Sequence, residues 1–161
     1  MRILFKQVCI TAMIFFSVQA GIAQKPAGKN SITAVQKFKP PKLYTTLGSF
    51  KDSSLVSVER AEAIIAMPLK IADAKNKEYS ISSYQFIYKR REVTEDEQTG
   101  KTSPTSSISS DRFKTTPLPE LWVNTIRDEL KPGEELFFFD IIVKDTQGRV
   151  MYAPDLKIIV Q

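Results

Sequence analysis

Histidine is absent from this 161-residue sequence, and the one cysteine, Cys9, lies near the N-terminus. Serine and cysteine hydrolases use a histidine as general base, so the Ser-His-Asp and Cys-His arrangements are excluded. A zinc site would also lack most of the side chains that zinc prefers. The sequence therefore favours binding over catalysis, and we predict no catalytic residues, no metal ligands and no cofactor.

Carboxylates are the reactive groups that remain, and one cluster of them stands out, Glu95-Asp96-Glu97 with Asp111 downstream. These oxygens could serve as calcium ligands, but EF-hand spacing is missing, and acidic residues in loops are usually just solvated. A carboxylate pair for glycoside hydrolysis, or a Ser–Lys pair, would be assembled only in space, so an enzyme stays open as a third hypothesis. The six glycines are scattered and form no phosphate-binding loop.

The first 23 residues have the order of a secretory signal peptide. Arg2 and Lys6 precede an apolar stretch at residues 8–18, and two small-residue sites follow. We predict cleavage between Ala23 and Gln24. An uncleaved anchor is the alternative, but the apolar stretch is shorter than the roughly 20 residues that a spanning helix needs. We therefore expect an extracytoplasmic protein with no membrane span after cleavage.

Basic residues are concentrated at the N-terminal end of the chain. The net charge of +5 falls to +3 when the two basic residues of the leader are removed, and Lys25–Lys42 then holds five lysines and no acid. Residues 43–161 hold 16 basic and 18 acidic side chains. Because nucleic-acid binding needs a clustered basic face, we expect no nucleic-acid partner. Residues 24–37 are predicted to be a flexible basic linker, either a solvated tether or a contact to an anionic envelope surface.

Short elements are predicted in the first half of the chain. Ser31–Phe38 and Leu43–Phe50 suggest strands. Val58–Ala63 is predicted to form one or two helical turns, with acidic residues at the positive end of the helix dipole. Ala63–Ile71 is apolar throughout, and we predict a strand there because Pro68 would shorten a helix.

Aromatic residues alternate in the clearest strand of this half, Tyr79–Arg90. Tyr84, Phe86 and Tyr88 recur with a period of two, which is typical of a strand with one covered face. Two interpretations follow, the core face of a sandwich, which we favour, and an aromatic binding platform. Trp122, in a later helix, is likewise assigned to the core.

Residues 92–110 follow this strand and carry acidic, Ser, Thr, Gly and Pro residues with almost nothing to bury. A segment of this composition inside a compact domain is usually a functional or disordered loop. The alternative is that its start extends the strand, with Thr99-Gly100 at the tip of a long hairpin.

The C-terminal part of the chain is the most strongly patterned. Pro119–Leu130 has a helical apolar stripe, and Lys131-Pro132-Gly133 ends it. Glu135–Lys144, Arg149–Tyr152 and Leu156–Gln161 are rich in aromatic and β-branched residues, as strands are. About seven short strands with turns between them predict a mostly β chain, an antiparallel, immunoglobulin-like β-sandwich with one or two short helices.

Several of these motifs resemble the C-terminal domain of the gliding-motility protein GldM and its PorM relatives. The likeness spans residues 38–161. The matching motifs are a Pro-Gly-acid turn leading into a strand, a hairpin closed by Gly-Arg, a proline and a final apolar strand, with weaker matches upstream. They are found at Leu130–Arg149, Pro154–Ile159, Pro40–Gly48, Ser57–Ala66 and Tyr79–Ile87.

The resemblance implies a periplasmic β-sandwich of the Bacteroidetes envelope that is not an enzyme. Members of the family join an inner-membrane motor to outer-membrane partners of the type IX secretion and gliding machinery. In this sequence the expected leader stands where the family has a membrane helix and further domains, so the motor-coupling role does not transfer. No motif places the partner-binding surface on particular residues.

From these observations we expect a secreted, non-enzymatic protein-interaction module with an envelope protein as partner. An accessory role in gliding motility or type IX secretion is its specific form. The alternative is a periplasmic β-sandwich that binds a small ligand or carbohydrate, with Tyr84, Phe86 and Tyr88, or residues 92–110, as its site.

Overall fold

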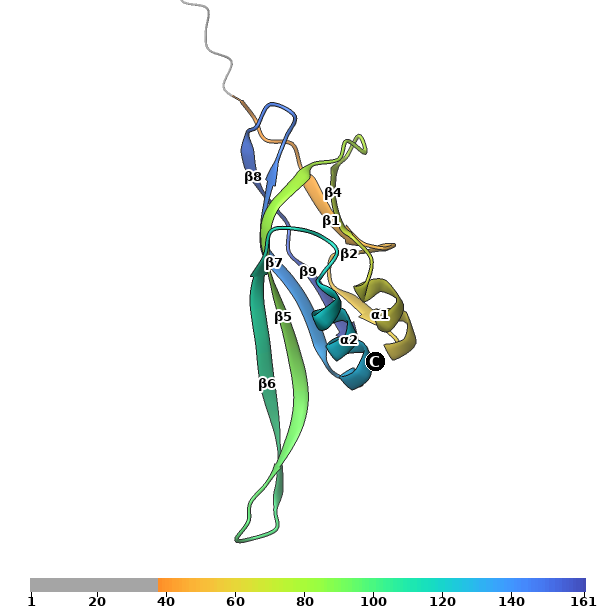
Figure 1. Cartoon of the computed structure of the whole chain (residues 1–161), viewed down its shortest axis with the longest axis vertical. Helices are drawn as coiled ribbons and strands as arrows, with labels where there is room; N and C mark the ends of the chain where they lie inside the picture. Colours follow the sequence, from red (N-terminus) through yellow and green to blue (C-terminus); the bar gives the residue numbers. More distant parts are fainter. Residues whose placement is uncertain (1–37) are drawn as a thin grey trace, which may run out of the picture. The chain divides into compact units, whose positions relative to one another are not determined.

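Two sheets lie face to face in the computed structural model, which describes residues 38–161 (Figure 1). The predicted leader, the cleavage site between Ala23 and Gln24, the linker at residues 24–37 and nearly all of the strand predicted at Ser31–Phe38 lie outside the described residues. Within them, the prediction of a mostly β, sandwich-like fold with two short helices is confirmed.

Nine strands and two helices follow one another between residues 38 and 161. The three-stranded sheet contains β1 (Leu43–Leu47), β2 (Phe50–Lys51) and β4 (Leu69–Asp73). The six-stranded sheet contains β3 (Ser54–Val56), β5 (Ser80–Glu95), β6 (Thr102–Phe113), β7 (Glu135–Lys144), β8 (Val150–Ala153) and β9 (Leu156–Val160). The helices are α1 (Val58–Ile65) and α2 (Glu120–Glu129).

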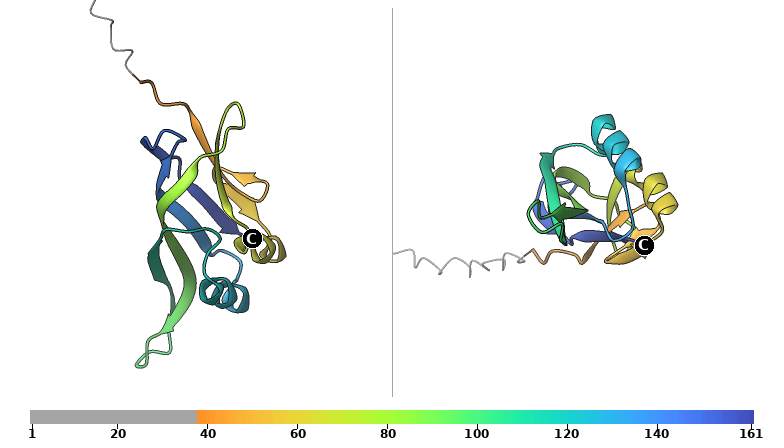
Figure 2. Two further views of the ribbon diagram at one scale, coloured as in Figure 1. Left: turned by 45° about the horizontal axis from the view of Figure 1, so that its top comes forward. Right: turned by 90° about the horizontal axis from the view of Figure 1, so that it is seen from below.

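The larger sheet has the strand order β3-β9-β7-β5-β6, and β8 pairs with the far half of β7. Its inner face is covered by the smaller sheet and by both helices, as two further views show (Figure 2). All pairs in it are antiparallel except β3 with β9, which run parallel with Ser54 opposite Ile158. The purely antiparallel prediction is therefore wrong for this pair, because β3 and β9 are distant in sequence and no hairpin joins them.

The segment Ala63–Ile71 was predicted as one strand and is instead divided between two elements. Ile64 and Ile65 end α1, where with Ala61 they form a buried stripe. The strand β4 begins only at Leu69, directly after Pro68. The prediction failed because the helical spacing of Ala61, Ile64 and Ile65 overlaps the apolar run, and an apolar run alone fits helix or strand.

The aromatic side chains predicted for the core face are all buried. Tyr84, Phe86 and Tyr88 have no solvent exposure. Phe86 lies 4.8 Å from Phe138 of β7, centroid to centroid, and meets the Trp122 ring edge-on at 5.5 Å. The core interpretation is confirmed, including that of Trp122, and the aromatic-platform alternative is wrong because these rings face the opposite layer of the sandwich.

Residues 92–110 form strands rather than a loop. β5 continues to Glu95, β6 begins at Thr102, and the two pair without interruption from Tyr84–Phe113 to Glu95–Thr102. The hairpin-tip alternative is confirmed, with Gly100 in the left-handed region at the turn. The outer part, residues 92–105, which we call the arm, is exposed at every position and extends away from the sandwich (Figure 1).

Candidate interaction surface

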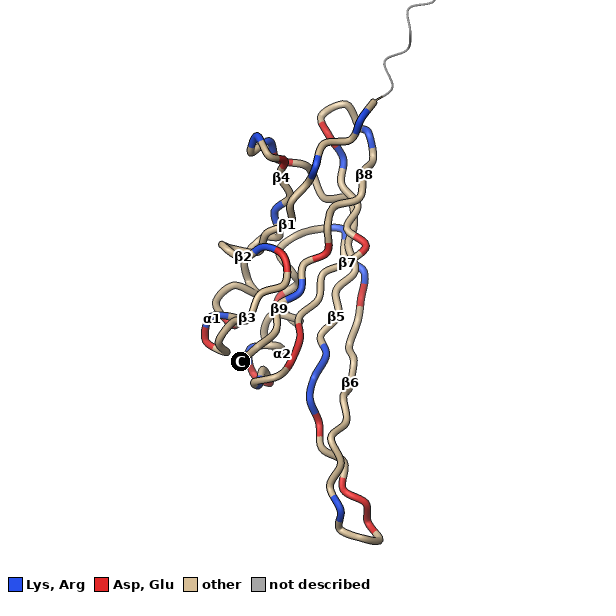
Figure 3. The backbone as a smooth tube through the Cα atoms, turned by 180° about the vertical axis from the view of Figure 1, so that it is seen from behind, with Lys and Arg blue, Asp and Glu red and all other residues tan. Residues whose placement is uncertain are grey.

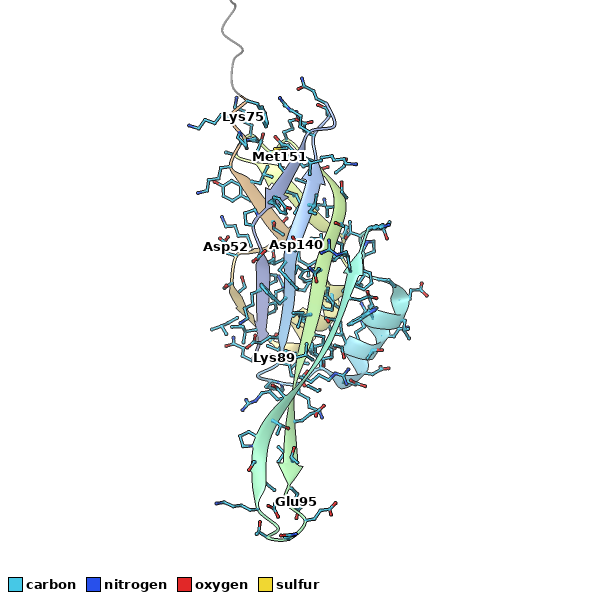
Figure 4. The ribbon with its side chains drawn as sticks, turned by 90° about the vertical axis from the view of Figure 1, so that its left-hand side faces the viewer. Asp52, Lys75, Lys89, Glu95, Asp140 and Met151 are labelled. Atoms are coloured by element: carbon cyan, nitrogen blue, oxygen red, sulfur yellow. The ribbon has the colours of Figure 1, made fainter. Side chains whose placement is uncertain are left out.

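The six-stranded sheet has one face without a covering layer in the described part of the chain, and we call it the open face. Figure 4 looks onto it, with Lys89 and Asp140 on that side. Its side chains are those that alternate with the buried ones along β5, β7 and β9. Apolar members of the open face are Leu55, Ile87, Ile108, Phe137, Phe139, Ile142, Val150, Tyr152 and Ile159.

Two stacked rings stand at the centre of the open face. Phe137 and Phe139 point outward on either side of the buried Phe138, and their rings are nearly parallel, 5.1 Å apart with an interplanar angle of 6°. Ile87 of β5 is paired with Phe137 across the strands. Antiparallel sheets with one solvated face usually carry polar residues there, so an apolar centre is the exception that marks a contact surface.

A charged triad borders these rings on the side of the sheet nearest α2. The Glu135 carboxylate is 3.6 Å from the Lys89 ammonium and 2.7 Å from the Lys157 ammonium. Hydrogen bonding to Lys157, with help from Lys89, lowers the pKa of Glu135. Two ammonium groups share one carboxylate, so the triad keeps a net positive charge.

On the other side of the rings, Asp140 interrupts the alternation of inward and outward side chains along β7. Its φ is +49°, and the register of β5 against β7 shifts in the same region. The carboxylate accepts hydrogen bonds from Gln85 at 3.1 Å and from the Arg112 guanidinium at 2.6 Å, and these two partners lower its pKa. This irregularity keeps Phe137 and Phe139 outward while returning Ile141 to the core.

The carboxylate of Glu134 is buried, and this residue is 2% exposed. It accepts hydrogen bonds from the Tyr88 hydroxyl at 2.5 Å, the Lys131 amide at 3.1 Å and the Arg91 amide at 3.3 Å. Burial and the hydrogen bond to Glu134 raise the pKa of Tyr88. Because these bonds tie the α2–β7 connection to β5, we assign Glu134 a structural role.

Two cavities lie near the base of β5 and β6. A cavity of about 450 Å³ opens beside β4 and the start of β5, with Lys70, Ser80 and Lys114 in its lining. A second of about 270 Å³ lies under α2 and is lined by Tyr88, Arg90, Ser109, Leu121, Trp122 and Thr125. In the second cavity the buried Nε of Arg90 makes no hydrogen bond, while its terminal nitrogens contact Ser109 and Glu129.

The acidic residues considered as calcium ligands are not brought together. Glu95, Asp96 and Glu97 lie at the arm tip, whereas Asp111 is paired with Phe86 at the base of the hairpin. Glu95 is nine positions beyond Phe86 in β5, which in a strand is about 30 Å. Among residues 38–161 no group of three or more acidic side chains is placed to hold a metal ion.

No protein-family model matches this chain, and no curated protein matches it. Within the described residues, neither helix has the length and apolar character needed to cross a membrane.

Sequence reasoning did not find the open face. The run Phe137-Phe138-Phe139 gives no sign of which ring faces outward, because the core side is defined only once β7 is paired with β5. A signal was available in the alternation of β5, where Ile87 falls among the polar positions between Phe86 and Tyr88.

Proposed function

We propose that this protein is a secreted, non-enzymatic interaction module of the cell envelope, and that its protein partner binds the open face. The observation that carries the proposal is the stacked pair Phe137 and Phe139 at the centre of a sheet whose other face already supplies the core. The leader-like N-terminus and the likeness to the GldM terminal domain support the envelope setting. An accessory role in gliding motility or type IX secretion is the specific form of the proposal.

A protein surface suits the open face better than a sugar ring does. Sugars stack on the broad face of an aromatic ring, and Phe137 and Phe139 turn one face each toward the other, which leaves one face of each ring for a sugar. The rings and their aliphatic neighbours instead form an apolar patch, and aromatic residues are enriched at the centre of protein–protein interfaces. The net positive triad at Glu135 favours a partner with carboxylates beside its apolar contact.

A non-enzymatic role is supported by the side chains that remain after leader cleavage. Residues 24–161 contain neither histidine nor cysteine. The buried Glu134, which would otherwise be the best candidate for an unusual acid, has its oxygens engaged by Tyr88, Arg91 and Lys131.

Site-specific photo-crosslinking in the envelope tests the proposal. A photoreactive residue replaces Phe139, and a matched probe replaces Leu121, which is 76% exposed on α2. We expect the Phe139 probe to crosslink to a component of the secretion or gliding machinery and the Leu121 probe not to crosslink to it. We also expect Phe137→Ser to weaken direct binding of the purified component. Equal capture from both positions, or no machinery component at Phe139, would reject the proposal.

Small-ligand binding is the second candidate function, and the cavity under α2 favours it. An indole, a guanidinium and three hydroxyls line this space, and these are groups that bind sugars and aromatic anions. Ligand-observed NMR with a panel of monosaccharides and aromatic carboxylates tests it. Signals abolished by Trp122→Leu, and kept in Tyr152→Leu, would support the cavity as the site, and no signals would reject it.

A further inference from the structure

The free edge of β6 is the longest unpaired strand edge of the larger sheet. β6 has 12 residues and pairs only with β5, whereas the opposite edge strand, β3, has three. In Figure 1 no element lies beyond β6 on its outer side. Natural proteins usually protect such edges with lysine, proline, bulges or a covering loop, because an open edge recruits other strands.

The ends of β6 are protected in this way, but its centre is not. Pro104 lies near the tip, and proline is tolerated in a strand where the missing N–H would point away from the neighbouring strand. At the base, the Arg112 amide donates to the Asp111 carboxylate at 2.7 Å and so is not used by β5. Both observations indicate that the even-numbered residues of β6 direct their N–H and C=O groups outward, which leaves Ser106, Ile108 and Ser110 with open main-chain groups.

We propose that a second copy of this chain binds the β6 edge, so that the two larger sheets join as one about a twofold axis at Ile108. This interface uses the strand edge. Ile108 is directly opposite Lys89, so its side chain lies at the margin of the open face, with β5 between it and the β7 rings to which the partner protein is assigned. The centre of the edge is uncharged and carries small hydroxyl side chains, so a neutral edge of the same kind fits it, and a twofold pair uses the same patch on both subunits.

The register follows from the side chains. Residues directly opposite in a sheet must point to the same face, and among the three outward-bonding residues Ile108 alone is apolar and is 62% exposed. Placing Ile108 opposite its copy buries both side chains against each other and pairs Ser106 with Ser110 on either side. About six main-chain hydrogen bonds would form, by the alternating pattern of antiparallel strands.

This register also brings the arm of each copy against the body of the other. In an antiparallel pair the arm of one copy runs along the body of the other, and Thr102 comes opposite Lys114 of the second copy. The turn at residues 96–101 then arrives level with the start of β5, beside the cavity of about 450 Å³. A two-stranded ribbon has little stability alone, so a neighbouring body would support it.

Charge at the two ends of this contact is complementary. One side of the arm tip is acidic in Figure 3, with Glu95, Asp96 and Glu97 in sequence, and Lys101 is the one basic residue in the turn. The cavity at the body carries Lys70 and Lys114, with Glu78 as the one acid in its lining. Asp96 builds the tip turn through bonds to the amides of Gln98 and Thr99, which leaves the two glutamates to face the lysines.

Disulfide trapping tests the twofold axis. In full-length protein carrying Cys9→Ser, the substitution Ile108→Cys provides a single thiol at the axis, and Leu55→Cys provides a matched exposed thiol at the opposite edge. We expect a dimer by sedimentation of the Cys9→Ser protein, and a disulfide-linked dimer that forms at least tenfold faster for Ile108→Cys than for Leu55→Cys. A monomer at all concentrations, or equal rates for the two thiols, would overturn the proposal.

Charge reversal tests the contact between the arm of one copy and the body of the other, and it leaves the centre of the β6 edge unchanged. Glu95→Lys with Glu97→Lys, or Lys114→Glu alone, should each weaken the dimer about tenfold, because each change occurs twice in a symmetric pair. Combining all three substitutions in one chain should restore most of the affinity. No weakening in either variant, or no recovery in the combination, would remove the arm from the interface. Neither assay uses the envelope partner, so their failure is distinct from failure of the proposed function.

Discussion

The two halves of the β5–β6 hairpin share one continuous ladder but are supported in different ways. In the body half, Tyr84, Phe86 and Tyr88 are fully buried between the sheet and α2. In the arm half, every residue from 92 to 105 is exposed, and the cross-strand contacts are polar, such as the Thr94–Thr105 and Glu92–Ser107 hydrogen bonds. Strand pairing alone therefore shapes the arm, while side-chain burial stabilises the body, and the arm is expected to open at a much lower free energy.

The largest expected effect comes from removing a ring in the body half. Phe86→Ala should lower the free energy of unfolding by about 3–5 kcal/mol, because Phe86 has no exposure and contacts Trp122 and Phe138. Val93→Ala, on the same strand but in the arm and 70% exposed, should change it by no more than about 0.5 kcal/mol. Urea unfolding measures both, and similar losses would contradict the contrast between the halves.

The second-largest expected effect concerns the buried carboxylate of Glu134. Glu134→Gln should cost about 2 kcal/mol, since a neutral amide is a poorer acceptor for Tyr88, Lys131 and Arg91 and leaves one of them unpaired. Its neighbour provides the control. Glu135→Gln removes only partly exposed ion pairs to Lys89 and Lys157, and should cost less than about 1 kcal/mol. A larger loss for Glu135→Gln by urea unfolding would show that the open face matters more for stability than we infer.

An effect at alkaline pH is expected from the body half. Burial raises the pKa of Tyr84 to about 12, against about 10 in an unfolded chain. Stability from the neutral phenol is fully present below pH 10 and is lost as the pH rises toward 12, because the unfolded state releases its proton first. Melting temperatures between pH 8 and pH 12 should therefore fall less steeply for Tyr84→Phe than for the natural sequence.

Tyr152→Phe is the control for this titration, because Tyr152 is 71% exposed on β8. Its alkaline slope should match that of the natural sequence. An unchanged slope in Tyr84→Phe would mean that other titrating groups, and not the Tyr84 phenol, cause the loss.

The body half could be predicted from the sequence, whereas the arm was predicted only as the alternative to a loop. The aromatic residues that alternate along β5 and the apolar stripe of α2 are buried side chains. Burial places apolar residues at regular positions, and this periodicity can be recognised in the sequence. The arm buries nothing, so residues 92–105 show the composition of a loop although their backbone forms a ladder. The open face was missed for a related reason, since Phe137 and Phe139 match the type of a core residue and only the pairing of β7 shows that they point outward.

The smallest expected effect is the most direct test of the difference between the body half and the arm half. Glu92 and Thr105 are directly paired, so residues 93–104 can be replaced by Asn-Gly, which suits a two-residue hairpin turn. At protein concentrations where the chain is monomeric, this replacement should change the free energy of unfolding by less than about 1 kcal/mol, because no buried side chain is removed. If the body is then as stable as before but the dimer is lost, the arm serves association rather than folding. A loss as large as that of Glu134→Gln would instead make the arm part of the folded core, and the division of the hairpin into two halves would be wrong.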